Sequence, residues 1–329
     1  MFKKISLILT LVLMIGLVFT VQAQAEEDPL VIYFFPGGPE GGPFSTIVYN
    51  GADYADEVLG DRVDVRYRWS DWSPEKMVTQ FQESVAANPD GIAIMGHPGD
   101  DALEPHVEAA KEQGITVTSQ NTTLPELEAS YFDEGFGYAG QDLYDSGYML
   151  GEAAVERAEL GEGDSAFIWG LKAQPTRGQR TRGAVDAVEE AGVEVDYMEI
   201  SSEVDADASA GIPVISGYLA ENPDTDLVIT DHGALTSTMD TYFEAAGKEP
   251  GEIYGAGFDL SPATLDAIEE GYVQLVHDQQ PFLQGFLPIF QIYLSEKYEF
   301  SGLHIDTGSG LVHKDNVDLL APLVEEGIR

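Results

Sequence analysis

Short apolar runs alternate with stretches suited to helices along nearly the whole chain, and this alternation limits the fold more than any other feature. In the first unit, residues 31–35 are β-branched and aromatic, residues 36–43 are rich in proline and glycine, and residues 44–59 suit a helix. The same unit recurs to about Leu294. Alternating strands and helices predict parallel sheets with helices on both faces. Ligands of such sheets bind at the loops that follow the strands, so the function is expected to lie there.

The predicted elements form two similar series. Strands are predicted at residues 31–35, 63–69, 91–95, 115–118, 166–169, 193–200, 227–230, 253–257 and 272–276. Helices are predicted at residues 44–59, 74–88, 101–113, 142–160, 177–191, 207–221, 234–246, 261–270 and 282–297. A further short strand is predicted at 129–132, three glycines interrupt residues 135–141, and residues 301–329 have no regular pattern. Because the series restarts near residue 140, we expect two similar doubly wound α/β lobes whose sheets face each other across a cleft.

The N-terminal residues have the pattern of a cleaved signal peptide, residues 1–25. Lys3 and Lys4 precede an apolar run at 5–21, and Ala-Gln-Ala at 23–25 is a small-residue cleavage site. A membrane anchor is the alternative interpretation of this run. The chain has no cysteine, which excludes disulfides, thiolate chemistry and lipid attachment through cysteine. The sequence therefore predicts a soluble, monomeric protein of the periplasm that is not a lipoprotein.

The chain is strongly acidic. It has 58 Asp and Glu against 16 Lys and Arg, which gives a formal net charge of −42. Such a surface repels nucleic acid and anionic membranes, so neither is an expected partner. Binding of cationic ligands is one explanation of the charge. Because the acidic residues are spread along the whole chain, we favour a halophilic adaptation of the surface, in which salt screens the self-repulsion.

No sequence motif for catalysis, a metal or a cofactor is convincing. The loop at 36–43 matches neither G-x-x-x-x-G-K-[ST] nor G-x-G-x-x-G, so phosphate binding is not expected there. Asp306-Thr307-Gly308 matches a short aspartic-protease signature, but there is no second copy and the predicted fold is wrong for it. No His-x-His, His-Glu-x-x-His or Gly-x-Ser-x-Gly sequence occurs. The prediction is a protein that is not an enzyme and needs no cofactor or metal.

Polar and aromatic residues gather in the predicted loops and first helical turns. The candidates for ligand contact are Phe44, Trp72, His97, Asn121, Asp142, Arg180, Asp231, Asp259 and Gln279. Carboxylates and amides bond several hydroxyls at once, and arginine offers a rigid fork of donors. Aromatic rings can cover the apolar face of a sugar ring. The set suits an uncharged polyhydroxyl ligand, although each polar residue alone is equally consistent with helix capping or turn stabilisation.

Several short motifs occur in the order typical of one protein family. They are Pro43-Phe44, Asp90-Gly91-Ile92-Ala93-Ile94, Gly114-Ile115-Thr116-Val117, Gly140-Gln141-Asp142, Arg180-Thr181-Arg182-Gly183, Gly255-Ala256-Gly257-Phe258-Asp259, Gln279-Gln280-Pro281 and Lys314-Asp315-Asn316-Val317. On these motifs the chain resembles the periplasmic sugar-binding proteins of ABC transporters, in the ribose/galactose-type group with the type I periplasmic binding protein fold. The resemblance extends over nearly the whole chain after residue 25.

The resemblance implies two lobes joined by a three-strand hinge and closing over a sugar. The N-terminal lobe would comprise 26–139 and 280–305, and the C-terminal lobe 140–279 and 306–329. The family's ligand residues carry over best to Arg180, Asp259 and Gln279. They also carry over to Phe44, Asn121, Asp142 and Asp231.

Two positions depart from the family pattern. Asn121-Thr122 stands where the family's ribose binders have an Asp-Arg pair, and Ser45 stands where a second aromatic residue is common. These departures argue against ribose itself as the ligand. Trp69 and Trp72 are candidates for the missing ring cover.

The resulting hypothesis is an extracytoplasmic protein that captures a monosaccharide or polyol by hinge closure and delivers it to the membrane subunits of an ABC permease. An exported sugar-active α/β enzyme is the alternative, and a sugar sensor that docks to a chemoreceptor is another. A sugar-responsive transcription regulator of the same fold would need an N-terminal helix-turn-helix and a basic face. The predicted signal peptide and the net charge of −42 argue against a regulator.

Overall fold

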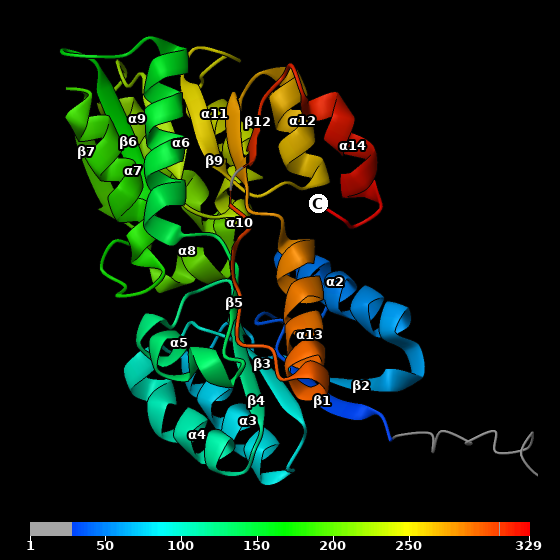
Figure 1. Cartoon of the computed structure of the whole chain (residues 1–329). Coiled ribbons are helices and arrows are strands. Elements are labelled where there is room, and N and C mark those ends of the chain that lie inside the picture. Colours follow the sequence, from blue (N-terminus) through cyan, green and yellow to red (C-terminus); the bar gives the residue numbers. More distant parts are fainter. Residues whose placement is uncertain (1–27, 309) are drawn as a thin grey trace, which may run out of the picture.

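The protein consists of two α/β lobes, one above the other in Figure 1. The computed structural model describes residues 28–308 and 310–329. Each lobe contains one six-stranded sheet with helices on both faces. These two sheets confirm the predicted fold class. The predicted signal peptide lies outside the described residues, and in the described part of the chain no helix is long and apolar enough to cross a membrane.

The first sheet is parallel throughout its described pairs. Its strand order is β11 (His304–Asp306), β5 (Tyr138–Gly140), β4 (Thr116–Gln120), β3 (Gly91–Met95), β1 (Leu30–Phe34) and β2 (Val63–Tyr67). The helices of this lobe are α2 (Pro43–Leu59), η1 (Gly60–Arg62), α3 (Pro74–Ala86), α4 (Asp100–Glu112), α5 (Pro125–Tyr131), η2 (Phe132–Glu134) and α13 (Pro281–Tyr298). β3 and β4 are buried along their whole length, as expected of central parallel strands covered on both faces.

The second sheet repeats this plan with one antiparallel edge. Its strand order is β12 (Gly310–Val312), β10 (Leu275–Asp278), β9 (Tyr254–Phe258), β8 (Leu227–Thr230), β6 (Ser165–Gly170) and β7 (Glu194–Glu199). Only β12 runs antiparallel to its neighbour among the described pairs. The helices are α6 (Leu143–Ala158), α7 (Gly178–Glu190), α8 (Ser202–Ala206), η3 (Ala208–Gly211), α9 (Ile212–Glu221), α10 (Gly233–Thr236), α11 (Met239–Ala245), α12 (Pro262–Glu270) and α14 (Val317–Glu325).

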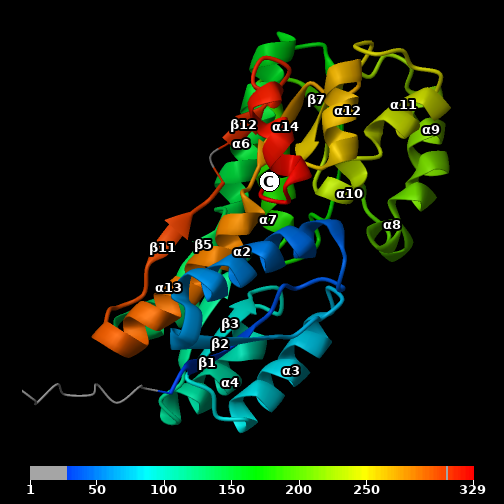
Figure 2. The ribbon, with the colours of Figure 1, turned by 90° about the vertical axis from the view of Figure 1, so that its right-hand side faces the viewer.

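The chain passes from one sheet to the other three times. The first crossing follows β5, the second follows β10, and the third lies between β11 and β12. Figure 2 shows β5, β11 and α13 together on one side of the molecule. The third crossing bonds to the first, because the backbone N–H of Thr307 donates to the carbonyl of Gly140 at 2.8 Å. It bonds to the second through the Thr307 hydroxyl, which donates to the carbonyl of Gln279 at 2.8 Å.

Residues 129–132 and 272–276 differ from their predicted structure. Residues 129–132 lie in α5 and η2 instead of a strand, because Pro125 opens a helix whose first turn carries acidic Glu126 and Glu128. The strand predicted at 272–276 is β10, which begins three residues later and includes polar His277 and Asp278. Both polar side chains are buried with partners, since His277 bonds the carbonyl of Gly308 and Asp278 bonds Arg329.

The C-terminal residues are regular, contrary to the prediction for 301–329. They form β11, β12 and α14. Each of the two strands has only three residues, which is too short to give a period-2 pattern in the sequence. They form because they pair with β5 and β10, strands that are distant along the chain.

One helix pair in each lobe packs with unusually close backbones. A Cβ atom on Gly51 of α2 would lie 1.9 Å from the carbonyl oxygen of Phe282 in α13, and one on Gly285 would lie 1.9 Å from that of Val48. In the second lobe, α6 and α7 approach in the same way at Gly147 and Gly183. Only glycine fits at these positions, because any side chain would force the two helices apart.

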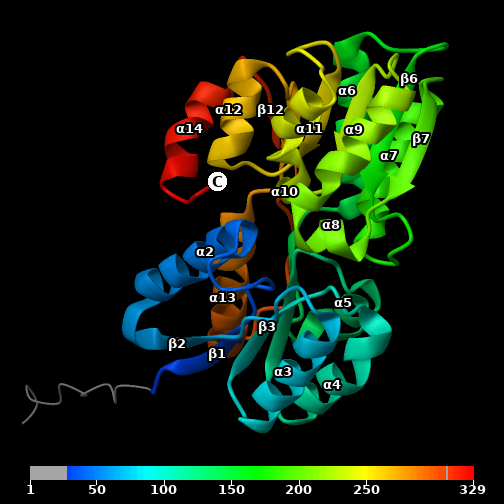
Figure 3. The same ribbon diagram turned by 180° about the vertical axis from the view of Figure 1, so that it is seen from behind.

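The last residues of the chain join the two lobes. After α14, the carbonyl of Gly327 accepts a hydrogen bond from Asn50 Nδ2 of α2 at 3.0 Å. Arg329 then donates to Asp278 Oδ2 at 2.9 Å, beside the second crossing. In Figures 1 and 3 the C-terminal end lies between α14 and α2. The tail therefore contacts the first lobe although its helix belongs to the second.

Replacing Arg329 by alanine is expected to reduce the free energy of unfolding by about 2 kcal/mol, because it leaves the buried carboxylate of Asp278 unpaired. The side chain of Asp278 is 3% exposed and that of Arg329 is 25% exposed. Urea denaturation measures the change. The control is Lys76→Ala, which removes an exposed pair with Asp71 and is expected to change stability by less than about 1 kcal/mol. Equal losses in the two variants would contradict the prediction.

Candidate functional site

The loops that follow the strands of the two sheets meet between the lobes. Trp72 follows β2, His97 follows β3 and Asn121 follows β4 in the first lobe. In the second lobe, Asp231, Asp259 and Gln279 follow β8, β9 and β10. The lobes approach closely at the edge of this region, since a Cβ atom on Gly99 would lie 3.7 Å from the Thr176 methyl group. The structure thus brings six of the predicted residues to facing sheet edges.

A chain of hydrogen bonds runs from one lobe to the other through four of these residues. His97 Nε2 lies 2.9 Å from Asn121 Oδ1, and Asn121 Nδ2 donates to Gln279 Oε1 at 3.2 Å. Gln279 Nε2 donates to Asp259 Oδ1 at 2.6 Å. Asn121 and Gln279 are buried, with 9% and 2% of their surface exposed. The lobes are therefore joined by polar side chains at the predicted site.

Arg180, in the first turn of α7, is a buried cation whose side chain forms no hydrogen bond with the described residues. It is 6% exposed, and its guanidinium stacks on the Phe258 ring at 4.5 Å. Its Nε has no hydrogen-bond partner, and no carboxylate of the described residues forms an ion pair with it. Burial lowers the pKa of Arg180, while Asp231 and Asp259 act in the opposite direction. A buried guanidinium whose Nε lacks a partner is a candidate for binding a ligand.

The carboxylate of Asp231 is held by the protein on both oxygens. Oδ2 accepts from the Leu171 N–H and the Thr181 hydroxyl, each at 3.0 Å. Oδ1 lies 2.6 Å from His232 Nδ1. Burial alone would raise the pKa of Asp231, but His232 and Arg180 more than offset this and lower it to about 2. Asp231 is thus a fixed negative charge beside Arg180.

Asp259 has a strained backbone and a less fully bonded carboxylate. Its φ is 69°, and Asn121 and Trp72 are also left-handed, with φ of 63° and 58°. Such conformations are costly for residues other than glycine and occur frequently at functional sites. Besides Gln279, the carboxylate accepts one bond, from the Gly233 N–H at 3.1 Å. Burial raises the pKa of Asp259, and Arg180 opposes the effect.

Three aromatic rings form a row on the first-lobe side. The Phe44 and Trp72 ring centroids are 5.8 Å apart, and those of Trp72 and His97 are 5.7 Å apart. The indole lies against the proline- and glycine-rich loop, where a Cβ atom on Gly37 or Gly38 would come within 2.7 or 2.6 Å of it. The loop therefore needs glycine to admit the Trp72 ring. Trp69 lies elsewhere, against Tyr49.

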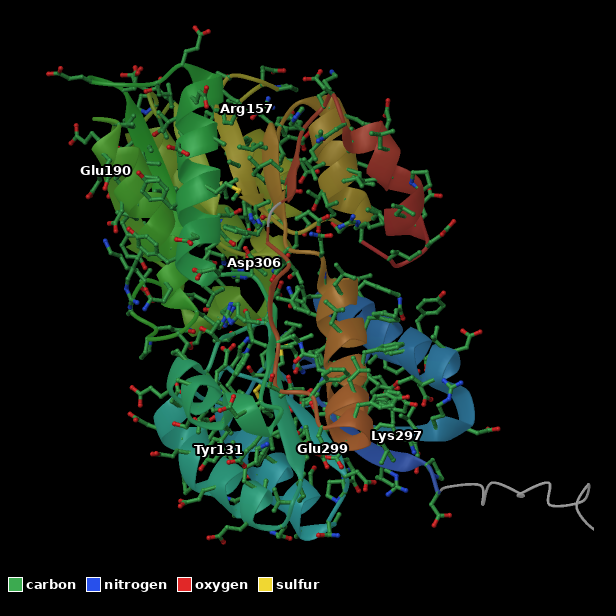
Figure 4. All side chains as sticks on the ribbon, viewed as in Figure 1. Tyr131, Arg157, Glu190, Lys297, Glu299 and Asp306 are labelled. Atoms are coloured by element: carbon green, nitrogen blue, oxygen red, sulfur yellow. The ribbon has the colours of Figure 1, made fainter. Side chains whose placement is uncertain are left out.

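Asp142 is the one predicted site residue that the structure does not bring to this cluster. It is the N-cap of α6, and its side chain accepts from the Asp145 N–H at 3.2 Å. Its own N–H donates to Asp306 Oδ1, and Figure 4 shows Asp306 at the crossing between the lobes. The capping interpretation explains this residue.

Two residues outside the predicted ligand set, Arg177 and His232, lie beside the site. Arg177 precedes Arg180 by one helical turn and pairs with Asp205 of α8 at 3.6 Å. His232 lies 3.8 Å from the same carboxylate. In the sequence both residues are close to a predicted site residue, Arg177 to Arg180 and His232 to Asp231. Their shared partner Asp205 is distant in the sequence and reaches them only through the packing of α8.

Two histidines, the half-buried His97 and the buried His277, make stability sensitive to mild acid. Burial lowers the pKa of His97 to about 3, with a further effect of Arg177. Burial also lowers the pKa of His277 to about 4. Below the unfolded value of about 6.5, the unfolded chain binds protons that the folded protein does not, so stability is complete above that pH and declines as the pH falls.

From pH 6.5 to 5.5, each of these histidines is expected to lower the free energy of unfolding with a limiting slope of about 1.4 kcal/mol per pH unit. His277→Gln is expected to remove about half of their combined slope. Urea denaturation across this range measures it. The carboxylates of Asp259 and Asp278, whose pKa values are raised, give a slope of the opposite sign, which is the same in the wild type and in His277→Gln. An unchanged slope in His277→Gln would contradict the prediction.

The fold and the site together define a two-lobe binding protein, with its polar groups at facing sheet edges and three crossings to one side. The chain belongs to the family of periplasmic binding proteins, because the family model described as periplasmic binding protein domain matches residues 32–294. The predicted family is thereby confirmed.

Individual proteins resemble the chain over most of its length. A xylose/arabinose-binding protein, XylF, from Sulfolobus acidocaldarius is 29% identical over 310 residues, which are 89% of this chain and 74% of that protein. A carbohydrate transporter protein from Acidothermus cellulolyticus, in complex with myo-inositol, has a TM-score of 0.76 and 25% identity, with 92% of this chain and 100% of that chain covered.

A LacI-type transcriptional regulator from Bacteroides fragilis shares the fold alone. It has a TM-score of 0.74 and 18% identity, with 89% and 99% of the two chains covered. The fold therefore does not by itself separate transport from regulation.

Proposed function

We propose that this protein captures a monosaccharide or polyol between its lobes and delivers it unchanged to an ABC permease. The observation that carries the proposal is Arg180, a buried guanidinium with an unpartnered Nε, near the carboxylates of Asp231 and Asp259. A cation flanked by anions favours a neutral ligand that both donates and accepts hydrogen bonds, as a hydroxyl does. An anionic ligand would be repelled by the carboxylates.

The ligand would contact both lobes. Arg180, Asp259 and Gln279 would bond its hydroxyls from the second lobe, and His97 and Asn121 from the first. The row of Phe44 and Trp72 would cover an apolar ring face. The bound ligands named for similar proteins, xylose or arabinose and myo-inositol, are neutral and rich in hydroxyls, which supports this chemistry.

Closure would move two units about the three crossings. We propose the units 26–139 with 280–305, and 140–279 with 306–329. Apart from Gly140 and Asp306, which end β5 and β11, residues of these ranges build the first and second sheets respectively. Ligand binding shifts the equilibrium between the open and closed forms toward the closed form, because the ligand's hydrogen bonds come from both lobes. Closed lobes would be presented to the permease outside the cytoplasm, after removal of residues 1–25.

Thermal unfolding against pentoses, hexoses, inositols and short polyols tests the ligand class. A ligand of the folded state raises the unfolding midpoint by mass action. We expect one or two compounds of the panel to do so, and we expect NMR to recover them unchanged. If no compound of the panel raises the unfolding midpoint, a simple sugar or polyol is rejected as the ligand. If the bound compound is converted to another compound, the protein is an exported sugar-active enzyme instead.

We also propose that the acidic surface is an adaptation to salt. The net charge is −42, and among the described carboxylates only Asp231 and Asp278 are buried. The other described acidic residues reach solvent at least in part, where salt screens their mutual repulsion. Denaturation at increasing concentrations of potassium chloride tests the proposal, which requires the protein to gain stability up to molar salt.

A further inference from the structure

The direction of the hydrogen bonds around Asn121 is determined by groups that can only accept. The first such group is the Asp259 carboxylate. Gln279 Nε2 lies 2.6 Å from Asp259 Oδ1, so the amide NH₂ must face the carboxylate. The carbonyl oxygen of Gln279 then faces Asn121, whose Nδ2 is 3.2 Å away and must donate to it.

A second acceptor fixes Asn121 independently through Gln284, a fully buried residue of α13. Gln284 Nε2 lies 2.9 Å from the backbone carbonyl of Gln279, which only accepts, and 3.3 Å from the Thr307 hydroxyl oxygen. Because the Thr307 hydroxyl donates its proton to the same carbonyl, its oxygen accepts from Gln284. The carbonyl oxygen of Gln284 therefore faces Asn121 Nδ2, at 3.0 Å.

Both routes give Asn121 the same orientation, with its NH₂ toward the two glutamines and its Oδ1 toward His97. Oδ1 lies 2.9 Å from His97 Nε2. A carbonyl oxygen cannot donate, so Nε2 must carry the hydrogen. In the neutral imidazole, Nδ1 is then an unprotonated acceptor, and no hydrogen bond to Nδ1 occurs among the described residues.

We propose that Gln284 is a positioning residue that presets the tautomer of His97, so that His97 accepts a hydrogen bond from a hydroxyl of the ligand. Gln284 acts through Asn121 without touching the ligand. Its helix packs on β4 and α2 of the first lobe, so it holds Asn121 before the lobes close. Gln279 and Asp259 reach Asn121 from the second lobe and reinforce the same orientation on closure. The ligand part rests on the proposed function, whereas the tautomer does not.

The tautomer is measured without ligand, by long-range ¹H–¹⁵N NMR of the ¹⁵N-histidine-labelled full chain at neutral pH. The chain has six histidines, and His97→Gln assigns the relevant signals. We expect His97 to be neutral with the proton on Nε2. A proton on Nδ1, or on both nitrogens, would overturn the proposal.

Gln284→Met tests the positioning role, because methionine keeps the volume and removes both the acceptor and the donors. We expect signals of the second His97 tautomer to appear beside those of the first in this ligand-free variant, because only the 3.2 Å bond to Gln279 then orients Asn121. The matched control is Gln113→Met, at the exposed C-cap that follows α4, which should leave the His97 signals unchanged. A wild-type tautomer in folded Gln284→Met would refute the role of Gln284.

The ligand part is tested with wild-type protein and analogues of whichever sugar binds. Replacing the hydroxyl that faces His97 by hydrogen or by fluorine should weaken binding equally, about tenfold, because neither group donates a hydrogen bond. Binding of the fluoro analogue as tight as that of the parent sugar would show that His97 acts as a donor, which overturns this part. If no sugar binds, the proposed function fails while the NMR result on the tautomer still decides the role of Gln284.

Discussion

Arg180→Ala is expected to abolish ligand binding and to leave the protein folded. The guanidinium offers several donors in a buried position, and its Nε is unpartnered. Hydrogen bonds from a charged group contribute about 1.5–3 kcal/mol each, so two of them correspond to a loss of affinity of about 150-fold to 25,000-fold. Alanine would also leave Asp231 and Asp259 without the nearby cation, which raises the cost of keeping both ionised.

Isothermal titration with the sugar found in the thermal panel measures this loss. The matched control is Arg157→Ala, which removes an exposed arginine on α6 that Figure 4 shows far from the crossing. The control should bind as the wild type does. A folded Arg180→Ala protein that loses less than tenfold in affinity would remove the main support for the proposed site.

Gly285→Val is expected to lower the free energy of unfolding by about 3 kcal/mol or more, because the new side chain cannot fit between α13 and α2. Its Cβ would lie 1.9 Å from the carbonyl oxygen of Val48 and 2.8 Å from the backbone nitrogen of Ala52. Backbone atoms of a helix cannot move aside alone, so the whole helix must shift. The ring contacts between Tyr54 and Phe286 at this interface would be lost with it.

Urea denaturation of Gly285→Val measures the effect, and Gly217→Ala is the matched control. Gly217 lies inside α9 with nothing within 4 Å of a Cβ atom. Alanine there should stabilise the protein by about 0.5–1 kcal/mol, because it lowers the entropy of the unfolded chain and favours the helix. If Gly285→Val were as stable as the wild type, the close packing of α2 and α13 would be disproved.

The corresponding helix pair in the second lobe has a consequence for the site. A Cβ atom on Gly147 would lie 1.9 Å from the carbonyl oxygen of Arg180. The close approach of α6 and α7 therefore sets the position of the backbone that carries the guanidinium. In this lobe, the same packing device that holds the helices together also places a candidate binding residue.

Local sequence patterns were sufficient for the alternating architecture and for the loops that carry the site. The run at 91–95 forms β3 and is wholly buried, as its apolar composition predicts. Six predicted residues lie at the strand ends, because the carboxyl ends of parallel strands must share one edge of a sheet. Arg180 was predicted from the motif at the start of its helix.

Only the tertiary structure determined the features that depend on distant contacts. β11 and β12 have three residues each and exist because β5 and β10 pair with them. For Asp142 the sequence left ligand contact and helix capping open, and the structure shows that it caps α6.

Gln284 shows the same limit within the site. In the sequence Gln284 is a polar residue within a mostly apolar predicted helix, and nothing near it in the sequence indicates its partners. Its role follows only when Asn121, Gln279 and Thr307, from three separate segments, are placed around it. The spacing of apolar residues in the sequence indicates which face of a helix or strand is buried. The partners of a buried polar group depend instead on how the helices and strands pack together.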